Sequence, residues 1–252
     1  MIEVVSSRRE SAESALRLVP EVVSAEQASF PEQQFVNFIF FRVGHEYRKL
    51  AETEQRELKT EFCSVFDSFR SELLLFSYSL IGFDSKVDLM FWRVGRSLDV
   101  IQEMTAKLYQ TDLGSYLEPA DNYLSTTKKM MFVADETGAR THVLAGSAKY
   151  HFIYPCAKHS EWGEIPLEVR DQMIEEKFMV GKRFPNIKIH LTHAFGFSEQ
   201  EYLISFETDD PRDFLALAEE LRQTPASKFT LRGMPIYTCR QRTLLECLDA
   251  VG

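Results

Sequence analysis

The chain has 252 residues, of which 44% are hydrophobic, enough to bury one large core or two smaller ones. Its 29 basic and 38 acidic residues give a net charge of -9, which repels nucleic-acid phosphates and anionic lipid, so nucleic acid is not an expected partner. No apolar run approaches the roughly 20 residues of a membrane span, and charges interrupt the apolar residues near the N-terminus, so the sequence predicts a cytoplasmic protein without a membrane partner.

The first part of the chain predicts an arm followed by a mixed α and β unit. Residues 1–34 are polar and are expected to form an N-terminal arm. Apolar spacing then predicts alternating elements, and Ser97 is a candidate N-cap. In chain order these elements are a strand at 35–44, a helix at 45–69, strands at 72–82 and 86–95, a helix at 97–110 and a strand at 122–133.

The second part repeats this order. Pro211 is expected to begin a helix that the acidic run ending at Asp210 caps. The expected elements are a strand at 149–159, a helix at 166–184, strands at 187–197 and 201–210, a helix at 211–224 and a strand at 228–240.

A strand–helix–strand–strand–helix–strand order in each part is typical of the ferredoxin-like fold, whose sheet has one face covered by helices. The sequence therefore predicts an α+β protein with two ferredoxin-like halves, at 35–134 and 148–243, whose sheets pack face to face in an α+β barrel. The polar loop between Ala134 and Ala148 is the expected boundary. Aromatic-rich runs in the two predicted strands at 35–44 and 86–95 suggest contacts between chains in a homo-oligomer.

Short catalytic and metal-binding motifs are absent from the sequence. The six histidines form no close ligand pair on a helix, and His190 and His193 should point to opposite faces of one strand. The four cysteines form no CxxC pair, so we expect reduced thiols, with Cys156 in a core. No phosphate-binding glycine loop or nucleophile elbow occurs. No resident metal site is predicted from these patterns.

Several longer segments resemble one family. These are YPCAKHSEW, EEKFMVGKRFP, HAFGFSEQEYLISFETDDPRDF and LRQTPASKFT, together with FDSKVDLMFWRVG in the first half. They are similar to the chlorite dismutase and coproheme decarboxylase family, and the similarity covers most of the chain from about Phe35. The resemblance implies paired ferredoxin-like halves, a ring-shaped homo-oligomer, often a pentamer, and a heme or coproheme pocket in the C-terminal half.

Three positions depart from the family pattern. Where relatives place the histidine that ligates iron, this chain has Lys177, and where one group of decarboxylases has its catalytic tyrosine, it has Phe152. The distal position aligns with Ile189, or with His190 if the alignment shifts by one residue. The resemblance thus implies that ordinary chlorite dismutation and tyrosine-dependent coproheme decarboxylation are absent, and whether the chain is an enzyme stays open.

Other family positions are retained. Tyr154, Lys158 and Ser227 fall where relatives contact the porphyrin propionates, and with Lys177 they are the candidate cofactor-binding residues. The simpler alternative is that Tyr154 ends a strand, Lys158 is a solvated surface cation and Ser227 begins a turn.

Lys177 lies on an apolar stripe of its predicted helix, and three interpretations compete. Its ammonium can reach a surface carboxylate such as Glu176 while its methylenes cover the apolar face. It can instead lie in a persisting pocket, as a cation for a ligand carboxylate or, as a neutral amine, as an unusual iron ligand. In the third, Lys177 and Phe178 fill the former cavity. The expected function is binding of heme, a related tetrapyrrole or another anionic ligand; the alternative is a heme-free oligomeric scaffold or interaction protein.

Overall fold

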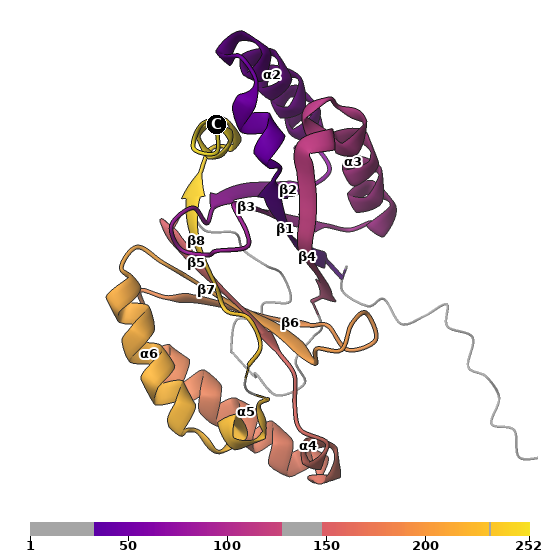
Figure 1. The fold of residues 1–252 in the computed structure, drawn as a ribbon. Coiled ribbons are helices and arrows are strands. Elements are labelled where there is room, and N and C mark those ends of the chain that lie inside the picture. The colour runs from indigo at the N-terminus through magenta and orange to yellow at the C-terminus, as the bar shows by residue number, and fades with distance from the viewer. Residues whose placement is uncertain (1–32, 128–147, 232) are drawn as a thin grey trace, which may run out of the picture. The chain divides into compact units, whose positions relative to one another are not determined.

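Eight antiparallel strands form a closed barrel in the computed structural model, which describes residues 33–127, 148–231 and 233–252 (Figure 1). The strand order around the barrel is β1-β3-β2-β8-β5-β7-β6-β4. The first four strands are β1 (Phe35–Val43), β2 (Leu74–Ser79), β3 (Leu89–Gly95) and β4 (Leu117–Thr126). The last four are β5 (Tyr150–Cys156), β6 (Lys188–His193), β7 (Tyr202–Thr208) and β8 (Tyr237–Arg242).

Each half of the chain supplies four neighbouring strands, and the two sets join where β2 pairs with β8 and β4 pairs with β6. Two helices cover the outer face of each set: α2 and α3 lie over the first, and α5 and α6 lie over the second (Figure 1). The predicted α+β class and the closure of the barrel are confirmed. The helices are α2 (Glu52–Ser68), α3 (Leu98–Gln110), α4 (Glu161–Glu164), α5 (Leu167–Lys182), α6 (Pro211–Gln223) and α7 (Leu244–Asp249), with 3-10 turns η2 (His45–Lys49), η3 (Leu113–Tyr116) and η4 (Pro225–Phe229).

Two helix starts agree with the sequence patterns. The Ser97 hydroxyl accepts hydrogen bonds from the backbone N–H groups of Asp99 and Val100, at 3.1 and 3.5 Å. The Asp210 carboxylate accepts from the backbone N–H of Arg212 at 2.9 Å, directly before the proline that begins α6. Both predicted caps are therefore confirmed.

None of the described helices is long and apolar enough to cross a membrane.

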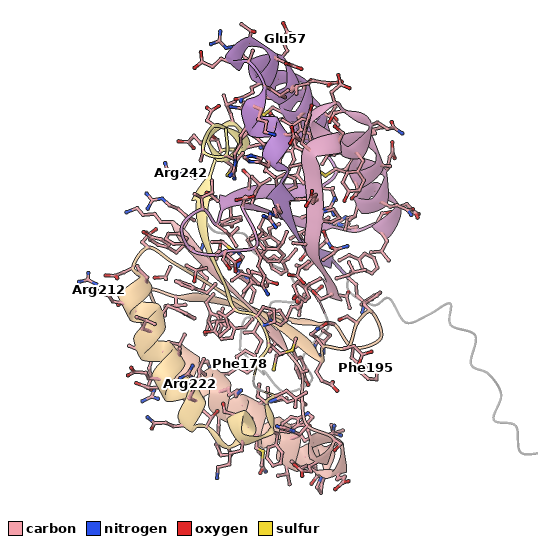
Figure 2. The ribbon with its side chains drawn as sticks, in the orientation of Figure 1. Glu57, Phe178, Phe195, Arg212, Arg222 and Arg242 are labelled. Carbon is pink, nitrogen blue, oxygen red and sulfur yellow. The ribbon has the colours of Figure 1, made fainter. Side chains whose placement is uncertain are left out.

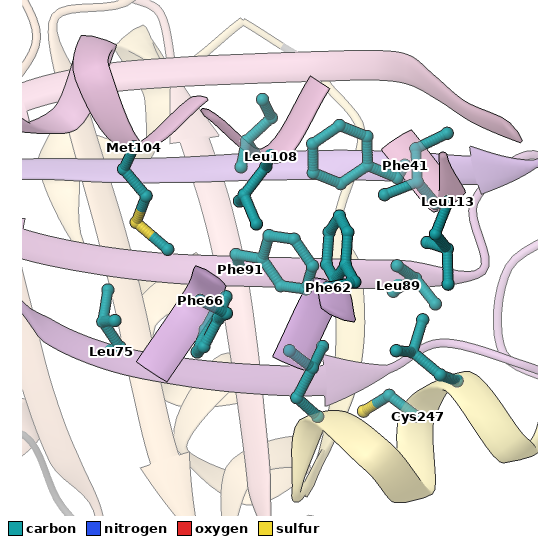
Figure 3. Close-up of a cluster of buried hydrophobic side chains, with 14 of the residues drawn as sticks. Phe41, Phe62, Phe66, Leu75, Leu89, Phe91, Met104, Leu108, Leu113 and Cys247 are labelled. Carbon is teal, nitrogen blue, oxygen red and sulfur yellow. The ribbon is translucent and has the colours of Figure 1, made fainter. Parts of the chain in front are cut away.

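Three apolar layers hold the fold together. One lies between the first sheet and its helices (Figure 3), one fills the barrel interior, and one lies between the second sheet and its helices. Alternate residues of a strand point to opposite faces, so Phe91 of β3 packs in the first layer and Trp92 in the barrel interior. Because β3 is covered on both faces, its sequence is almost continuously hydrophobic.

The last helix was not predicted from the sequence. Leu244, Cys247, Leu248 and Val251 pack into the layer under α2 and α3, and Figure 3 shows Cys247 facing that cluster from α7. This C-terminal segment follows the second half in the chain but completes the core of the first. Only six residues long, α7 is too short for its apolar periodicity to stand out.

Some element limits differ from the sequence expectations. The helix expected at 45–69 is divided into η2 and α2, separated near Leu50 by extended backbone. The strand expected at 228–240 is largely wrong, because η4 extends to Phe229 and β8 begins at Tyr237. β4 begins at Leu117, earlier than expected. Most of the arm and the boundary loop lie outside the described residues, so the proposed limits of the two halves stay predictions.

Candidate functional site

A cavity of about 70 Å³ lies between α5 and the outer face of β5, β6 and β7. Helical spacing brings one stripe of α5 toward the sheet, and residues two apart on a strand share that face. The apolar wall comprises Ile174 and Phe178 of α5, Ile189 and Leu191 of β6, and Ile204 and Phe206 of β7. Phe178 is labelled on α5 in Figure 2. The polar atoms at this cavity come from Lys158, Lys177, Tyr202 and Cys156.

A glycine allows α5 to approach the sheet closely at one end of the cavity. A Cβ atom at Gly181 would lie 2.6 Å from the Cδ1 atom of Ile189, closer than real side chains pack. The buried Gly181 therefore lets the Ile189 side chain lie beneath the helix. This close approach also narrows the space between the two elements.

Lys177 projects from α5 to the cavity and is half-buried. Burial lowers the pKa of its ammonium below the usual range, and the nearby Cys156 thiol opposes that shift. Among the described residues, no carboxylate lies within ion-pair distance of Lys177, and Glu176 beside it in sequence is exposed. The interpretation in which Lys177 pairs with a surface carboxylate therefore has no support in these contacts.

Lys158 also borders the cavity, but its ammonium is held by the fold. It donates hydrogen bonds to the Ala226 carbonyl oxygen at 2.9 Å and the Thr230 Oγ1 atom at 3.0 Å, and lies 4.6 Å from the Trp162 ring centroid. Burial, assisted by the charge of Lys177, lowers the pKa of Lys158 to about 8. Lys158 thus ties the end of β5 to η4 and is not a freely solvated surface cation.

The other two candidate cofactor residues do not line this cavity. Ser227 Oγ donates to the Leu221 carbonyl oxygen at 2.5 Å and lies 3.0 Å from Thr224 Oγ1, contacts that stabilise the turn after α6. The Tyr154 ring packs edge-on against Phe206, and burial raises the pKa of its phenol. Of the four candidates, the structure brings only Lys158 and Lys177 together at the cavity.

The catalytic-tyrosine position lies in a packed core. Phe152 stacks on Phe214 with ring centroids 3.8 Å apart and is only 5% exposed. At the distal position, Ile189 lines the cavity, whereas His190 points into the barrel, where its Nε2 atom is 3.0 Å from Glu207 Oε2. His193, on the other face of β6, packs against Tyr202, as the odd spacing predicts.

Sequence reasoning missed two residues that shape this site. Tyr202 shares a face of β7 with Ile204 and Phe206, so strand alternation could have identified it. Trp162 lies on the short α4 and reaches Lys158 only through the folded chain. No local sequence pattern predicts the contact between Trp162 and Lys158.

The geometry defines a class of protein: an α+β barrel of two ferredoxin-like halves with an apolar, lysine-bearing cavity under one helix of the second half. Residues 55–242 match the family model described as Chlorite dismutase. The chain belongs to the chlorite dismutase family.

Individual relatives agree with this assignment. Over 208 residues the chain is 24% identical to the chlorite dismutase of Ideonella dechloratans, covering 79% of this chain and 72% of that protein. Over 164 residues it is 24% identical to the coproheme decarboxylase of Mycolicibacterium smegmatis, covering 64% and 70%. A chlorite dismutase variant from Candidatus Nitrospira defluvii has the same fold, with a TM-score of 0.78 at 24% identity over 86% of this chain and 94% of that one.

Proposed function

We propose that this chain binds a small ligand with an apolar body and one acidic group in the cavity under α5, without chlorite dismutation or tyrosine-dependent coproheme decarboxylation. The observation that carries the proposal is an apolar cavity bordered by Lys177, for which the described residues supply no carboxylate partner. A half-buried cation that none of the described residues pairs with favours an anionic ligand beside it.

The residues present do not fit the tetrapyrrole that the family name suggests. A cavity of about 70 Å³ is far below the roughly 300–1,000 Å³ of pockets for drug-sized ligands. An imidazole is missing at position 177, and Ile189 offers no polar head over the cavity. Of the ligands expected from the sequence, the geometry therefore favours the smaller anion over heme or coproheme.

The chemistry of the cavity limits the size and polarity of its ligand. An engineered cavity of about 150 Å³ accepts the whole of benzene, so a cavity half as large suits an alkyl group of about three carbons, as in butyrate, with the carboxylate at Lys177 on the border of the cavity. Ile174 and Leu191 would contact the alkyl part and Lys177 would donate to the carboxylate. A hydrogen bond to a charged group contributes about 1.5–3 kcal/mol.

Calorimetric titration with butyrate tests the proposal. We expect wild-type protein to bind butyrate and Lys177→Met to bind it at least about tenfold more weakly, because the charge-assisted contact is lost. Lys188→Met is the matched control, because Lys188 is an exposed lysine at the start of β6. Equal butyrate affinity in wild type and Lys177→Met would overturn the proposal.

Parallel absorbance titrations with hemin, coproheme and metal-free porphyrin address the larger ligands. We expect no Soret band beyond that of free hemin, and no heme b after coproheme and peroxide are added. A sharp Soret band that Lys177→Met abolishes would instead support tetrapyrrole binding with the lysine amine near iron.

A second candidate function is a heme-free oligomeric scaffold in the cytoplasm. It is favoured by the internal hydrogen bonds of Lys158 and Ser227. These bonds use the two side chains that, by resemblance to the family, would otherwise contact the porphyrin propionates. Binding of neither butyrate nor any porphyrin, together with a stable homo-oligomer, would select this function.

A further inference from the structure

The position of Lys177 at the cavity bears on its reactivity as a nucleophile as well as on ion pairing. Its amine borders an apolar cavity, and a second lysine, Lys158, lies close enough for the two charges to repel. Lysines become nucleophilic when they are desolvated in an apolar pocket or placed beside another cation, because both conditions favour the neutral amine. Lys177 meets the first condition, because it borders the apolar cavity and burial there lowers its pKa.

The two lysines differ in availability. The Lys158 ammonium uses its hydrogens on two oxygen acceptors and lies over the Trp162 ring. The described residues give Lys177 no such hydrogen-bond acceptor and no ion-pair partner. Its lone pair, when the proton is lost, is therefore free to attack a molecule in the cavity.

We propose that Lys177 captures a small aldehyde or ketone in this cavity as an imine. The amine nitrogen attacks the carbonyl carbon, and a carbon–nitrogen bond forms as the carbonyl π electrons move to oxygen. Both amine hydrogens and the carbonyl oxygen then leave as water, so the step needs no oxidant, reductant or further reactant.

The apolar walls favour the product. Imines hydrolyse in water, and the side chains of Ile174, Phe178 and Leu191 limit how much water can reach position 177. The volume of about 70 Å³ restricts the carbonyl compound to a few heavy atoms. A three-carbon aldehyde is a suitable probe.

Reductive trapping in the wild-type protein tests the proposal. Propanal and cyanoborohydride convert each imine into a stable propyl-lysine, and peptide mass spectrometry measures the rate at every lysine of the same molecule. Lys188 is the internal reference because it is exposed. We expect Lys177 to be labelled faster than Lys188 near pH 7.5, because burial lowers the pKa of Lys177 and so increases its fraction of neutral amine.

The pH profile separates chemical reactivity from simple exposure. The labelling rate at Lys177 should level off below about pH 10.4, the pKa of an unperturbed lysine side chain, because burial lowers the pKa of Lys177. Lys177→Arg should abolish the fast labelling, and Lys188→Arg should keep it. Labelling of Lys177 no faster than of Lys188 would overturn the proposal.

This inference shares the cavity with the proposed function but does not rest on it. Butyrate should slow labelling at Lys177 and leave Lys188 unchanged if both hold. Fast labelling that butyrate does not affect would support carbonyl capture while contradicting carboxylate binding. Butyrate binding without fast labelling would overturn carbonyl capture alone.

Discussion

At the scale of single residues, we expect Lys158 to stabilise the folded state through hydrogen bonds that the sequence does not predict. We expect Lys158→Met to lower the free energy of unfolding by about 1 kcal/mol near pH 7, because Thr230 and Ala226 lose a donor while the cost of burying a charge disappears. Urea unfolding would measure this difference, with Lys188→Met as the control of unchanged stability.

The same comparison should depend on pH. The pKa of Lys158 is about 8 in the folded protein and about 10.4 in an unfolded chain, so the unfolded state binds more protons between these values. Stability of the wild type should therefore rise from about pH 8 toward pH 10, relative to Lys158→Met. A constant difference between the two proteins across this range would contradict the lowered pKa.

Residue roles were predictable only where they follow from local periodicity. The stripe of α5 that contains Lys177 was visible in the sequence, and the structure places that stripe over the sheet. The hydrogen bonds of Ser227 and Lys158 could not be predicted from the sequence. Their acceptors, Leu221, Ala226 and Thr230, come within reach only when η4 has formed. A family position alone does not reveal which polar group a fold already satisfies.

At the scale of elements, the distance between α5 and β6 controls the cavity. Gly181→Ala should gain about 1 kcal/mol of helix propensity, but its Cβ atom would displace the Cδ1 atom of Ile189. We expect near-unchanged thermal stability and about fivefold weaker butyrate binding, as Ile189 moves into the cavity. Thermal unfolding and calorimetry would measure the two effects.

A double variant tests this explanation. Gly181→Ala combined with Ile189→Val lacks the displaced atom, so it should recover most of the lost butyrate affinity. If the double variant binds as weakly as Gly181→Ala, the contact between α5 and β6 does not set the cavity volume.

Long elements were predicted better than short or irregular ones. The helices α3, α5 and α6 followed from apolar periodicity and their first residues. Residues around Met234 have strand-like composition but precede β8, and Gly233 has a φ of 91°, which interrupts extended backbone. The contacts of α7 with the first half depend on how the barrel closes, which no local pattern encodes.

At the scale of the whole molecule, the surface suggests where copies of the chain meet. The aromatic strands β1 and β3, expected to make such contacts, are largely buried inside the chain itself. Exposed aromatic residues instead include Phe195 and Phe197 in the turn between β6 and β7, at 76% and 43% exposure; Phe195 is labelled in Figure 2. Exposed aromatic clusters commonly mark contact surfaces.

We predict a closed homo-oligomer, with a pentamer as the expected size. Light scattering at micromolar concentration should give a multiple of the chain mass, and Phe195→Ser should shift the distribution toward smaller species. Phe83→Ser, in the corresponding turn of the first half, is an exposed aromatic control, at 51% exposure. A wild-type monomer under these conditions would exclude the prediction.

The position of α7 has a consequence for synthesis of the chain. A ribosome that has reached residue 243 has produced all eight strands of the described barrel, yet Leu244, Cys247, Leu248 and Val251 are missing from the core of the first half. Until they emerge, apolar side chains such as Phe62 stay partly uncovered and available to chaperones. The half made first is thus completed last, and a gene split between the two halves would give a first fragment that lacks part of its own core.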